Sequence, residues 1–121
     1  MKIKLFLTIA VALVLGSSCK SEYEALLQSN DVAGKYDAAF TYFEAGKYSR
    51  AIALFESLKL AVKGTAQDET VQYYTGMANY RWGDIFTAET CFDSFIKTFP
   101  LSVFTDRANY YYIECLYQQT L

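Results

Sequence analysis

The residues that could do covalent chemistry in this chain of 121 residues are three cysteines, Cys19, Cys91 and Cys115. The sequence contains no histidine. Histidine is the usual base beside a nucleophilic thiol and a common metal ligand. A catalytic cysteine would therefore lack its usual base, and a metal site would lack one of its usual ligands. We therefore expect no enzyme activity, no metal site and no cofactor. The chemistry most readily assigned is modification of Cys19.

Cys19 directly follows a segment with the features of a bacterial secretion signal. Two lysines precede an apolar stretch, Leu5 to Leu15, of 11 residues. A helix of that length is too short to span the roughly 30 Å hydrocarbon core of a membrane. The small residues Gly-Ser-Ser then lead into Cys19 and resemble a lipobox, although Gly16 stands where leucine is usual. We predict a cleaved signal peptide at residues 1–18 and a lipid anchor on Cys19. The alternatives are an ordinary secretory peptide and a short buried helix.

The charge of the mature chain limits the classes of partner that it could bind. Removing Lys2 and Lys4 with the signal lowers the formal net charge from −2 to −4. An acidic chain is a poor match for nucleic acid, whose phosphates recruit lysine and arginine. The same charge disfavours polybasic adhesion to anionic lipid, so membrane attachment must be covalent. Lys20 after the cysteine, where aspartate favours retention at the inner membrane, indicates an outer-membrane location.

The rest of the chain carries one pattern of small and aromatic residues twice. A small residue is followed by a glycine, an alanine and a phenylalanine at the same spacings in both copies: Ala39, Gly46, Ala51 and Phe55, then Gly76, Gly83, Ala88 and Phe92. Every member of the second copy lies 37 residues after its counterpart. Gly83 can take the positive φ that ends one helix, and Asp84 can cap the next. Gly76 and Ala88 would let those two helices approach closely.

This pattern resembles the tetratricopeptide repeat, a helix-turn-helix unit with a period of about 34 residues. It departs from that consensus at Gln72 and Asn79, where tryptophan and tyrosine are usual, and in its longer period. The resemblance implies an all-α, superhelical solenoid of about two and a half repeats over residues 31–121. Residues 19–30 form an anchor and a short amphipathic lead-in.

Caps and glycines predict five helices, at about Val32–Ala45, Tyr48–Val62, Ala66–Trp82, Ile85–Thr98 and Val103–Gln119. Thr65 and Asp68 resemble a capping box before the third of them, and Ser102 is a candidate cap for the fifth. No sustained alternation or hairpin turn indicates a strand. A fifth helix without a partner suggests the N-terminal part of a longer protein.

Cys91 and Cys115 fall in helices that are neighbours in such a solenoid. They could pair as a disulfide in an oxidising periplasm. We favour the alternative that both are small buried apolar residues.

In tetratricopeptide proteins, three places on the first helix of each repeat line a groove that receives extended peptides. Carried onto this sequence, those places are Tyr36, Phe40, Phe43, Tyr73, Met77, Tyr80, Tyr110, Glu114 and Tyr117. Arg81 and Arg107 would be the basic residues of the groove. An aromatic trough with arginine at its wall suits a peptide that has aromatic side chains and a carboxylate. The alternative is that the tyrosines cover the core and turn their hydroxyls to water.

The chain from Leu15 onward is similar to the BamD family, in particular its Bacteroidetes members. BamD proteins are lipoproteins of the outer-membrane β-barrel assembly machinery. The likeness rests on the lipobox, the short lead-in, and the segments Lys35–Phe55, Phe92–Ser102 and Asp106–Tyr110. It implies a lipid-anchored adaptor on the periplasmic face of the outer membrane. Such an adaptor binds a BamA-type barrel subunit and receives aromatic-ended segments of unfolded outer-membrane proteins.

Two other functions remain open, a glycan-capture lipoprotein and an unrelated repeat scaffold. Aromatic platforms also bind sugars, but tryptophan is the commonest of them. The one tryptophan, Trp82, is expected to face its partner helix. Glu44, Glu89 and Glu114 are scattered over different helices, so the carboxylate pair of a glycosidase is not evident.

Overall fold

The computed structural model describes residues 22–121. The chain divides into two compact units, Met1–Asp31 and Val32–Leu121. In the first unit, residues 22–28 are helical. Cys19 and the predicted signal peptide lie outside the described residues. Among residues 22–121 no helix is both long and apolar enough to cross a membrane.

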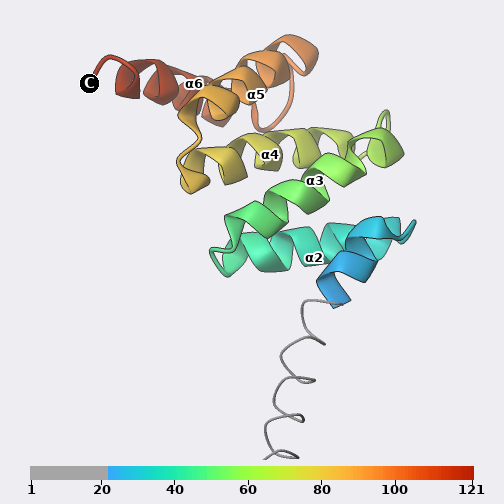
Figure 1. Ribbon diagram of the computed structural model, residues 1–121. Helices are drawn as coiled ribbons and strands as arrows, with labels where there is room; N and C mark the ends of the chain where they lie inside the picture. The colour runs from blue at the N-terminus through green and yellow to red at the C-terminus, as the bar shows by residue number, and fades with distance from the viewer. Residues whose placement is uncertain (1–21) are drawn as a thin grey trace, which may run out of the picture. The chain divides into compact units, whose positions relative to one another are not determined.

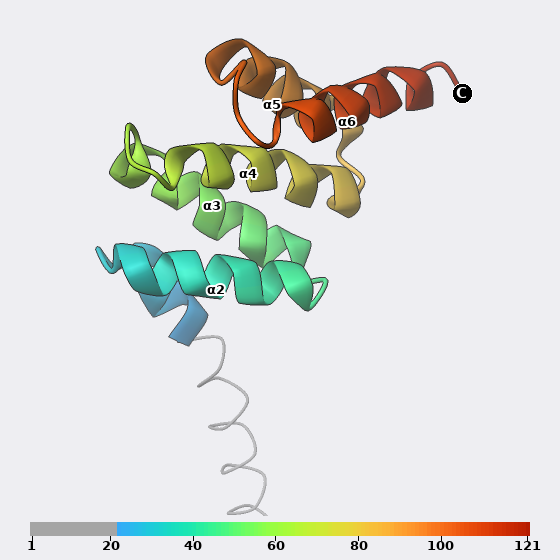
Figure 2. The same ribbon diagram turned by 180° about the vertical axis from the view of Figure 1, so that it is seen from behind.

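The second unit consists of five helices in series (Figure 1). They are α2 (Val32–Glu44), α3 (Tyr48–Val62), α4 (Asp68–Trp82), α5 (Ile85–Thr98) and α6 (Thr105–Gln118). Within this unit, helices that are consecutive in the chain pack against each other: α2 on α3, α3 on α4, α4 on α5 and α5 on α6. Both views show this succession as a stack that begins at α2 and ends at α5 and α6 (Figures 1 and 2). No strand occurs in the described part of the chain, so the all-α prediction is confirmed.

The turn between α4 and α5 forms as its residues predict. Gly83 has φ +96° and donates its N–H to the carbonyls of Asn79 and Tyr80, at 3.1 and 3.2 Å. A side chain is strained at such a φ, which explains the glycine. Asp84 then accepts the backbone N–H of Thr87 at 3.1 Å and its hydroxyl at 2.7 Å. One glycine and one aspartate therefore end α4 and begin α5.

The connection between α3 and α4 differs from the predicted capping box. The helix begins at Asp68 rather than near Ala66, so Asp68 occupies its first residue instead of its third. Its carboxylate accepts the N–H of Gly64 at 2.9 Å, not that of Thr65. Gln72 donates to the other carboxylate oxygen at 2.7 Å. The buried Asp68 thus ties the end of α3 to the first turn of α4.

Ser102 does not cap α6 directly, because it lies two residues before the N-cap position, Phe104. Its hydroxyl oxygen accepts the N–H of Phe104 at 3.2 Å, and α6 begins at Thr105. The hydroxyl of Thr105 donates to the carbonyl of Phe99 at 2.7 Å. These two bonds fix the turn that brings α6 back along α5.

The small and aromatic residues that the repeat pattern singles out lie in the core. Ala39, Ala51 and Phe55 are fully buried where α2 meets α3, and Ala88 and Phe92 are fully buried where α5 meets α4. A Cβ atom placed on Gly76 would lie only 2.8 Å from the Phe92 ring. Glycine at this position is what allows α4 and α5 to pack at their observed separation.

The same offset of 37 residues relates α4 to α6. Val71 and Ala78 of α4 are fully buried, and so are Ala108 and Cys115 at the equivalent places in α6. Ala108 and Cys115 belong to the same core cluster as Ala88, Phe92 and Phe95 of the preceding helix α5. The third unit of the repeat therefore begins in the same register as the second.

The structure corrects the prediction for Trp82 and decides how far each of the two cysteines is buried. Trp82 is 57% exposed and does not face the partner helix. It is the last residue of α4, where the Gly83 turn leads the chain away before α5 can cover the indole. Cys91 and Cys115 are both free thiols. Cys115 is fully buried as expected, whereas Cys91 is only partly buried.

Candidate functional site

A pocket of about 230 Å³ lies among the first helices of the three repeats, α2, α4 and α6. Five of its lining residues are aromatic or apolar and two are basic: Phe43, Tyr73, Tyr74, Met77, Tyr111, Arg81 and Arg107. None of these seven side chains is acidic. We call this the arginine–aromatic pocket.

Five of the sequence-predicted groove residues line the arginine–aromatic pocket, namely Phe43, Tyr73, Met77, Arg81 and Arg107. The others do not. Tyr36 lines a separate pocket with residues of α2 and Gln67. Phe40 packs its ring against Phe55 and Tyr74 in the interior, at centroid distances of 5.2 and 4.9 Å.

Three further predicted groove residues, Tyr80 of α4 and Tyr110 and Tyr117 of α6, lie outside the pocket lining. Tyr80 contacts the pocket residue Tyr111, with ring centroids 5.1 Å apart, but does not line the pocket itself. Tyr110 and Tyr117 are more than half exposed on another side of α6. The continuous trough expected from the repeat positions is therefore represented here by one compact pocket.

Tyr74 and Tyr111 line the pocket although the repeat positions did not select them. The Tyr74 ring contacts those of Phe43 and Tyr73, at centroid distances of 5.4 and 5.2 Å. Tyr111 stacks on Phe92 with centroids 5.7 Å apart. These two tyrosines lie 37 residues apart, so their shared place in the repeat was a signal present in the sequence. Both tyrosines were missed because only three positions on the first helix of each repeat were taken as groove positions.

Tyr73 serves the core and the pocket together. Its side chain is 3% exposed, and its ring stacks on Phe104 with centroids 4.6 Å apart. Burial raises the pKa of its hydroxyl, while the positive charge of Arg107 and a hydrogen bond with it act in the opposite direction. The hydroxyl therefore stays protonated at neutral pH and remains a neutral hydrogen-bonding group beside a cation.

Arg81 and Arg107 supply the positive charge of the pocket. The guanidinium carbon of Arg81 lies 5.8 Å from the Phe43 ring centroid, within cation–π range. Arg107 belongs to the first turn of α6, so the two cations come from different repeats. Within residues 22–121, neither guanidinium forms an ion pair with a carboxylate. Both are available to an anionic group from a ligand.

Tyr80 connects α4 to α6 beside the pocket. Its hydroxyl accepts a hydrogen bond from the Gln118 amide at 3.0 Å. Burial raises the pKa of this hydroxyl, and the bond from Gln118 partly opposes the rise. This contact joins residues 38 apart in sequence and helps hold α6 at the angle that closes the pocket.

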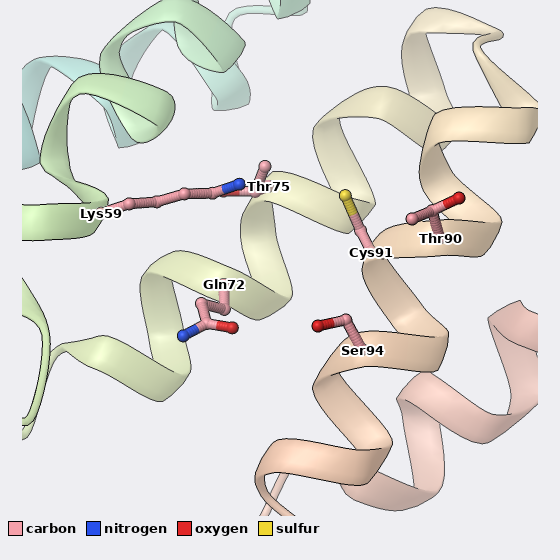
Figure 3. Close-up of a pocket in the computed structure, with 6 residues that line it drawn as sticks. All are labelled: Lys59, Gln72, Thr75, Thr90, Cys91 and Ser94. Carbon is pink, nitrogen blue, oxygen red and sulfur yellow. The ribbon is translucent and has the colours of Figure 1, made fainter.

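A second pocket, of about 170 Å³, lies among α3, α4 and α5 and has a different character. Polar side chains dominate its lining: Lys59, Gln72, Thr75, Thr90, Cys91 and Ser94. Lys59 extends from α3 toward Thr75 of α4, and Cys91 and Ser94 project from α5 (Figure 3).

The thiol in this second pocket is not activated. Burial raises the pKa of Cys91, and the nearby charge of Lys59 only partly opposes that effect. A thiol held protonated without a base is a poor nucleophile. Among the described residues no cluster of histidine, cysteine, aspartate or glutamate could hold a metal ion.

Comparison with known families assigns the repeat. Residues 70–102, which include most of α4 and all of α5, match the model of the tetratricopeptide repeat. The fold is an all-α helical repeat of the tetratricopeptide type. Such repeats are typically scaffolds that bind other proteins rather than enzymes. No curated protein matches the chain.

Proposed function

We propose that this chain is a lipid-anchored adaptor of the outer-membrane β-barrel assembly machinery, of the BamD type, that binds unfolded outer-membrane proteins. The observation that carries the proposal is the composition of the arginine–aromatic pocket, which joins aromatic rings to Arg81 and Arg107 without an acidic lining residue. A peptide that presents an aromatic side chain beside a carboxylate complements both features.

The pocket divides into two parts with separate tasks. The rings of Tyr74 and Tyr111 offer surfaces on which an aromatic side chain can pack. The guanidinium groups of Arg81 and Arg107 can form charge-assisted hydrogen bonds with a carboxylate. Because Arg81 packs on Phe43 and Arg107 interacts with Tyr73, both cations are partly positioned before a ligand arrives. Less side-chain entropy is then lost on binding.

The location and the partners of the chain belong to the same proposal. Diacylation of Cys19, with cleavage of residues 1–18 that makes it the mature N-terminus, would anchor the protein to the outer membrane at its periplasmic face. A BamA-type barrel subunit would be its partner within the machinery. Support comes from the lipobox-like residues before Cys19 and from the resemblance of the repeat segments to the BamD family.

Peptide binding to the full chain tests the pocket. Fluorescence anisotropy would compare a peptide that ends in phenylalanine with a free carboxylate against the same peptide as its amide. Arg81→Gln and Arg107→Gln should each weaken the carboxylate peptide about tenfold, or about 1.4 kcal/mol, and the amide much less. Lys97→Gln, which removes an exposed cation that does not line the pocket, is the matched control and should change neither affinity.

Two results would contradict the proposed binding. One is equal affinity for the carboxylate and the amide in the native chain. The other is binding of an oligosaccharide, but not of the peptide, that depends on Tyr74 and Tyr111. The latter result would favour a glycan-capture lipoprotein.

Acylation is tested separately in bacteria that express the full chain. Metabolic labelling with palmitate should label the native chain and leave Cys19→Ala unlabelled and in the soluble periplasmic fraction. Cys91→Ala is the control cysteine variant and should keep its label. A labelled Cys19→Ala chain would show that the anchor has been assigned to the wrong residue.

A further inference from the structure

A third pocket lies at the beginning of α2, beside the connection from α3 to α4. Its volume is about 420 Å³, larger than that of the arginine–aromatic pocket, and we call it the Tyr36 pocket. Its lining residues all belong to the second unit, and only one of them is charged: Val32, Ala33, Tyr36, Asp37 and Gln67. The repeat allows the chemistry of this pocket to be compared with that of an equivalent place that is filled.

The connection from α5 to α6 has the same local structure as the connection from α3 to α4. Gln67 directly precedes α4 with φ −87° and ψ −12°, and Phe104, 37 residues later, directly precedes α6 with φ −92° and ψ −7°. The N–H of Gln67 donates to the hydroxyl of Thr65 at 3.2 Å. The N–H of Phe104 donates to the hydroxyl of Ser102, also at 3.2 Å. The side chains of Gln67 and Phe104 therefore leave the backbone at equivalent places.

In the second repeat this place is occupied by an aromatic ring. Phe104 stacks on Tyr73 with centroids 4.6 Å apart and an angle of 12° between the rings, and it meets Tyr74 edge-on at 6.0 Å. Tyr73 is only 3% exposed as a result of this packing and that of α5. The residues 37 positions before Tyr73 and Tyr74 are Tyr36 and Asp37, which line the Tyr36 pocket. The first repeat therefore keeps the first tyrosine and lacks the ring that covers it.

The groups that remain in the Tyr36 pocket indicate a ligand. Tyr36 is only half-buried, and the Gln67 side chain makes no cap bond with α4. Asp37 is exposed, and within residues 22–121 its carboxylate forms no ion pair. An aromatic side chain could pack on the tyrosine, and a cation beside it could pair with the carboxylate.

We propose that the Tyr36 pocket binds an aromatic side chain that lies next to a lysine or arginine in a partner polypeptide. The aromatic ring stacks on Tyr36 as Phe104 stacks on Tyr73, and the neighbouring cation pairs with Asp37. The charge preference is opposite to that of the arginine–aromatic pocket, whose two cations favour a carboxylate. This site goes beyond the proposed function, because it requires neither a free carboxylate nor an outer-membrane client.

Fluorescence anisotropy with the full 121-residue chain tests the ligand. The probe is a fluorescein-labelled peptide, Gly-Ser-Gly-Phe-Lys-Gly-Ser-Gly, whose C-terminus is amidated so that it offers no terminal carboxylate. Replacing its phenylalanine with alanine should weaken binding at least about tenfold, because the ring supplies most of the buried apolar area. Replacing its lysine with glutamine should weaken binding about two- to fivefold, the range of an exposed ion pair.

A variant of the chain supplies the missing ring from within. In Gln67→Phe the new ring should stack on Tyr36, raise the thermal midpoint by at least about 2 °C, and lower the affinity for the probe at least about tenfold because the place of the ligand is taken. Ala66→Phe is the matched control. It adds the same ring at an exposed residue whose counterpart 37 residues later, Val103, is 88% exposed. This control should keep the native affinity and the native midpoint.

A second variant tests the charge. Asp37→Asn should weaken the lysine probe about two- to fivefold and leave the glutamine version of the peptide unchanged. Asp37 is exposed, so the substitution should leave the fold intact, which circular dichroism checks. Equal losses for the two peptides would show that Asp37 does not meet the cation, and would overturn this part of the proposal.

Arg81→Gln separates this site from the arginine–aromatic pocket and should leave the affinity for the amidated probe unchanged. The proposal is overturned if the probe does not bind, if its binding survives Gln67→Phe, or if its binding depends on Arg81. The carboxylate peptide and the amidated probe can fail separately, because one needs the arginines and the other needs Tyr36 and Asp37. A failure of either site is therefore distinguishable from a failure of the other.

Discussion

Helices α4 and α6 have the same average hydrophobicity and nearly equal lengths, yet α4 buries eight of its residues and α6 buries two. The difference arises from their neighbours. Helix α4 packs against α3 on one side and α5 on the other, whereas within the second unit α6 packs mainly against α5 and reaches α4 through contacts such as those of Tyr80 with Tyr111 and Gln118. The helix that follows α4 therefore contributes a large share of its burial. Stability is therefore shared between neighbouring units rather than held within one.

The largest test of this comparison removes the ring at the centre of the α4–α5 contact. Phe92→Ala should lower the free energy of unfolding by about 3–5 kcal/mol, because it leaves a cavity in a fully buried site. Phe86→Ala, on the same helix but 71% exposed, should change it by less than about 0.5 kcal/mol. Urea denaturation measures both. Similar losses for the two variants would mean that α4 and α5 do not pack through Phe92.

A smaller loss is expected from overfilling the same interface. Ala88→Leu adds three carbons at a fully buried position opposite α4 and should cost about 1–3 kcal/mol. Ala66→Leu makes the same change at an exposed residue and serves as its control. Thermal unfolding would record a lower midpoint for Ala88→Leu only. An unchanged midpoint would show that the interface has room that the structure does not indicate.

The next prediction compares equivalent positions in α4 and α6. Gly76→Ala should gain up to about 1 kcal/mol of helix propensity but lose more by pushing its Cβ atom against Phe92, for a net loss of about 1 kcal/mol. Adding Phe92→Leu should recover part of that loss. Ile113→Ala, at the equivalent place in α6, should stay within about 0.5 kcal/mol of the native chain. Chemical denaturation of all three variants would decide, and a stabilised Gly76→Ala would contradict the close contact.

The smallest effect concerns the side of α6 that is covered. Burial raises the pKa of the Cys115 thiol to about 11, from an ordinary value of 9.0. Between these two values the unfolded chain loses this proton and the folded chain keeps it, so the contribution of Cys115 to stability falls as pH rises. The free energy of unfolding should therefore decline more steeply above pH 9 in the native protein than in Cys115→Ala. Parallel slopes would indicate that Cys115 is accessible to water when folded.

Local residues allowed much of the fold to be predicted. The positive φ of Gly83 and the carboxylate cap of Asp84 act within a few residues, so the turn between α4 and α5 could be assigned from sequence. Burial of Ala88 and Phe92 followed from their spacing on one side of a helix. The boundary at Asp68 was placed two residues too early, because its carboxylate bonds Gly64 across a turn that sequence does not specify.

The site was less predictable than the fold. The groove places on α4 gave Tyr73 and Met77, and both line the arginine–aromatic pocket. On α6, however, Tyr111 lines the pocket while its neighbour Tyr110 faces outward, because the crossing of α6 over α5 sets which side of the helix points toward α4. Adjacent residues on a helix differ in direction by about 100°. A modest change in the orientation of α6 would therefore place Tyr110 instead of Tyr111 in the pocket.

By itself, the sequence determined the helical repeat, its offset of 37 residues, and the small and aromatic residues at which its helices meet. These features depend on local conformational preference and on periodic burial, and both can be read along the chain. Only the tertiary structure decided which aromatic residues share a pocket with Arg81 and Arg107, and which side of α6 remains open. Both outcomes depend on the relative placement of helices far apart in sequence, and that placement is set by how their side chains pack together.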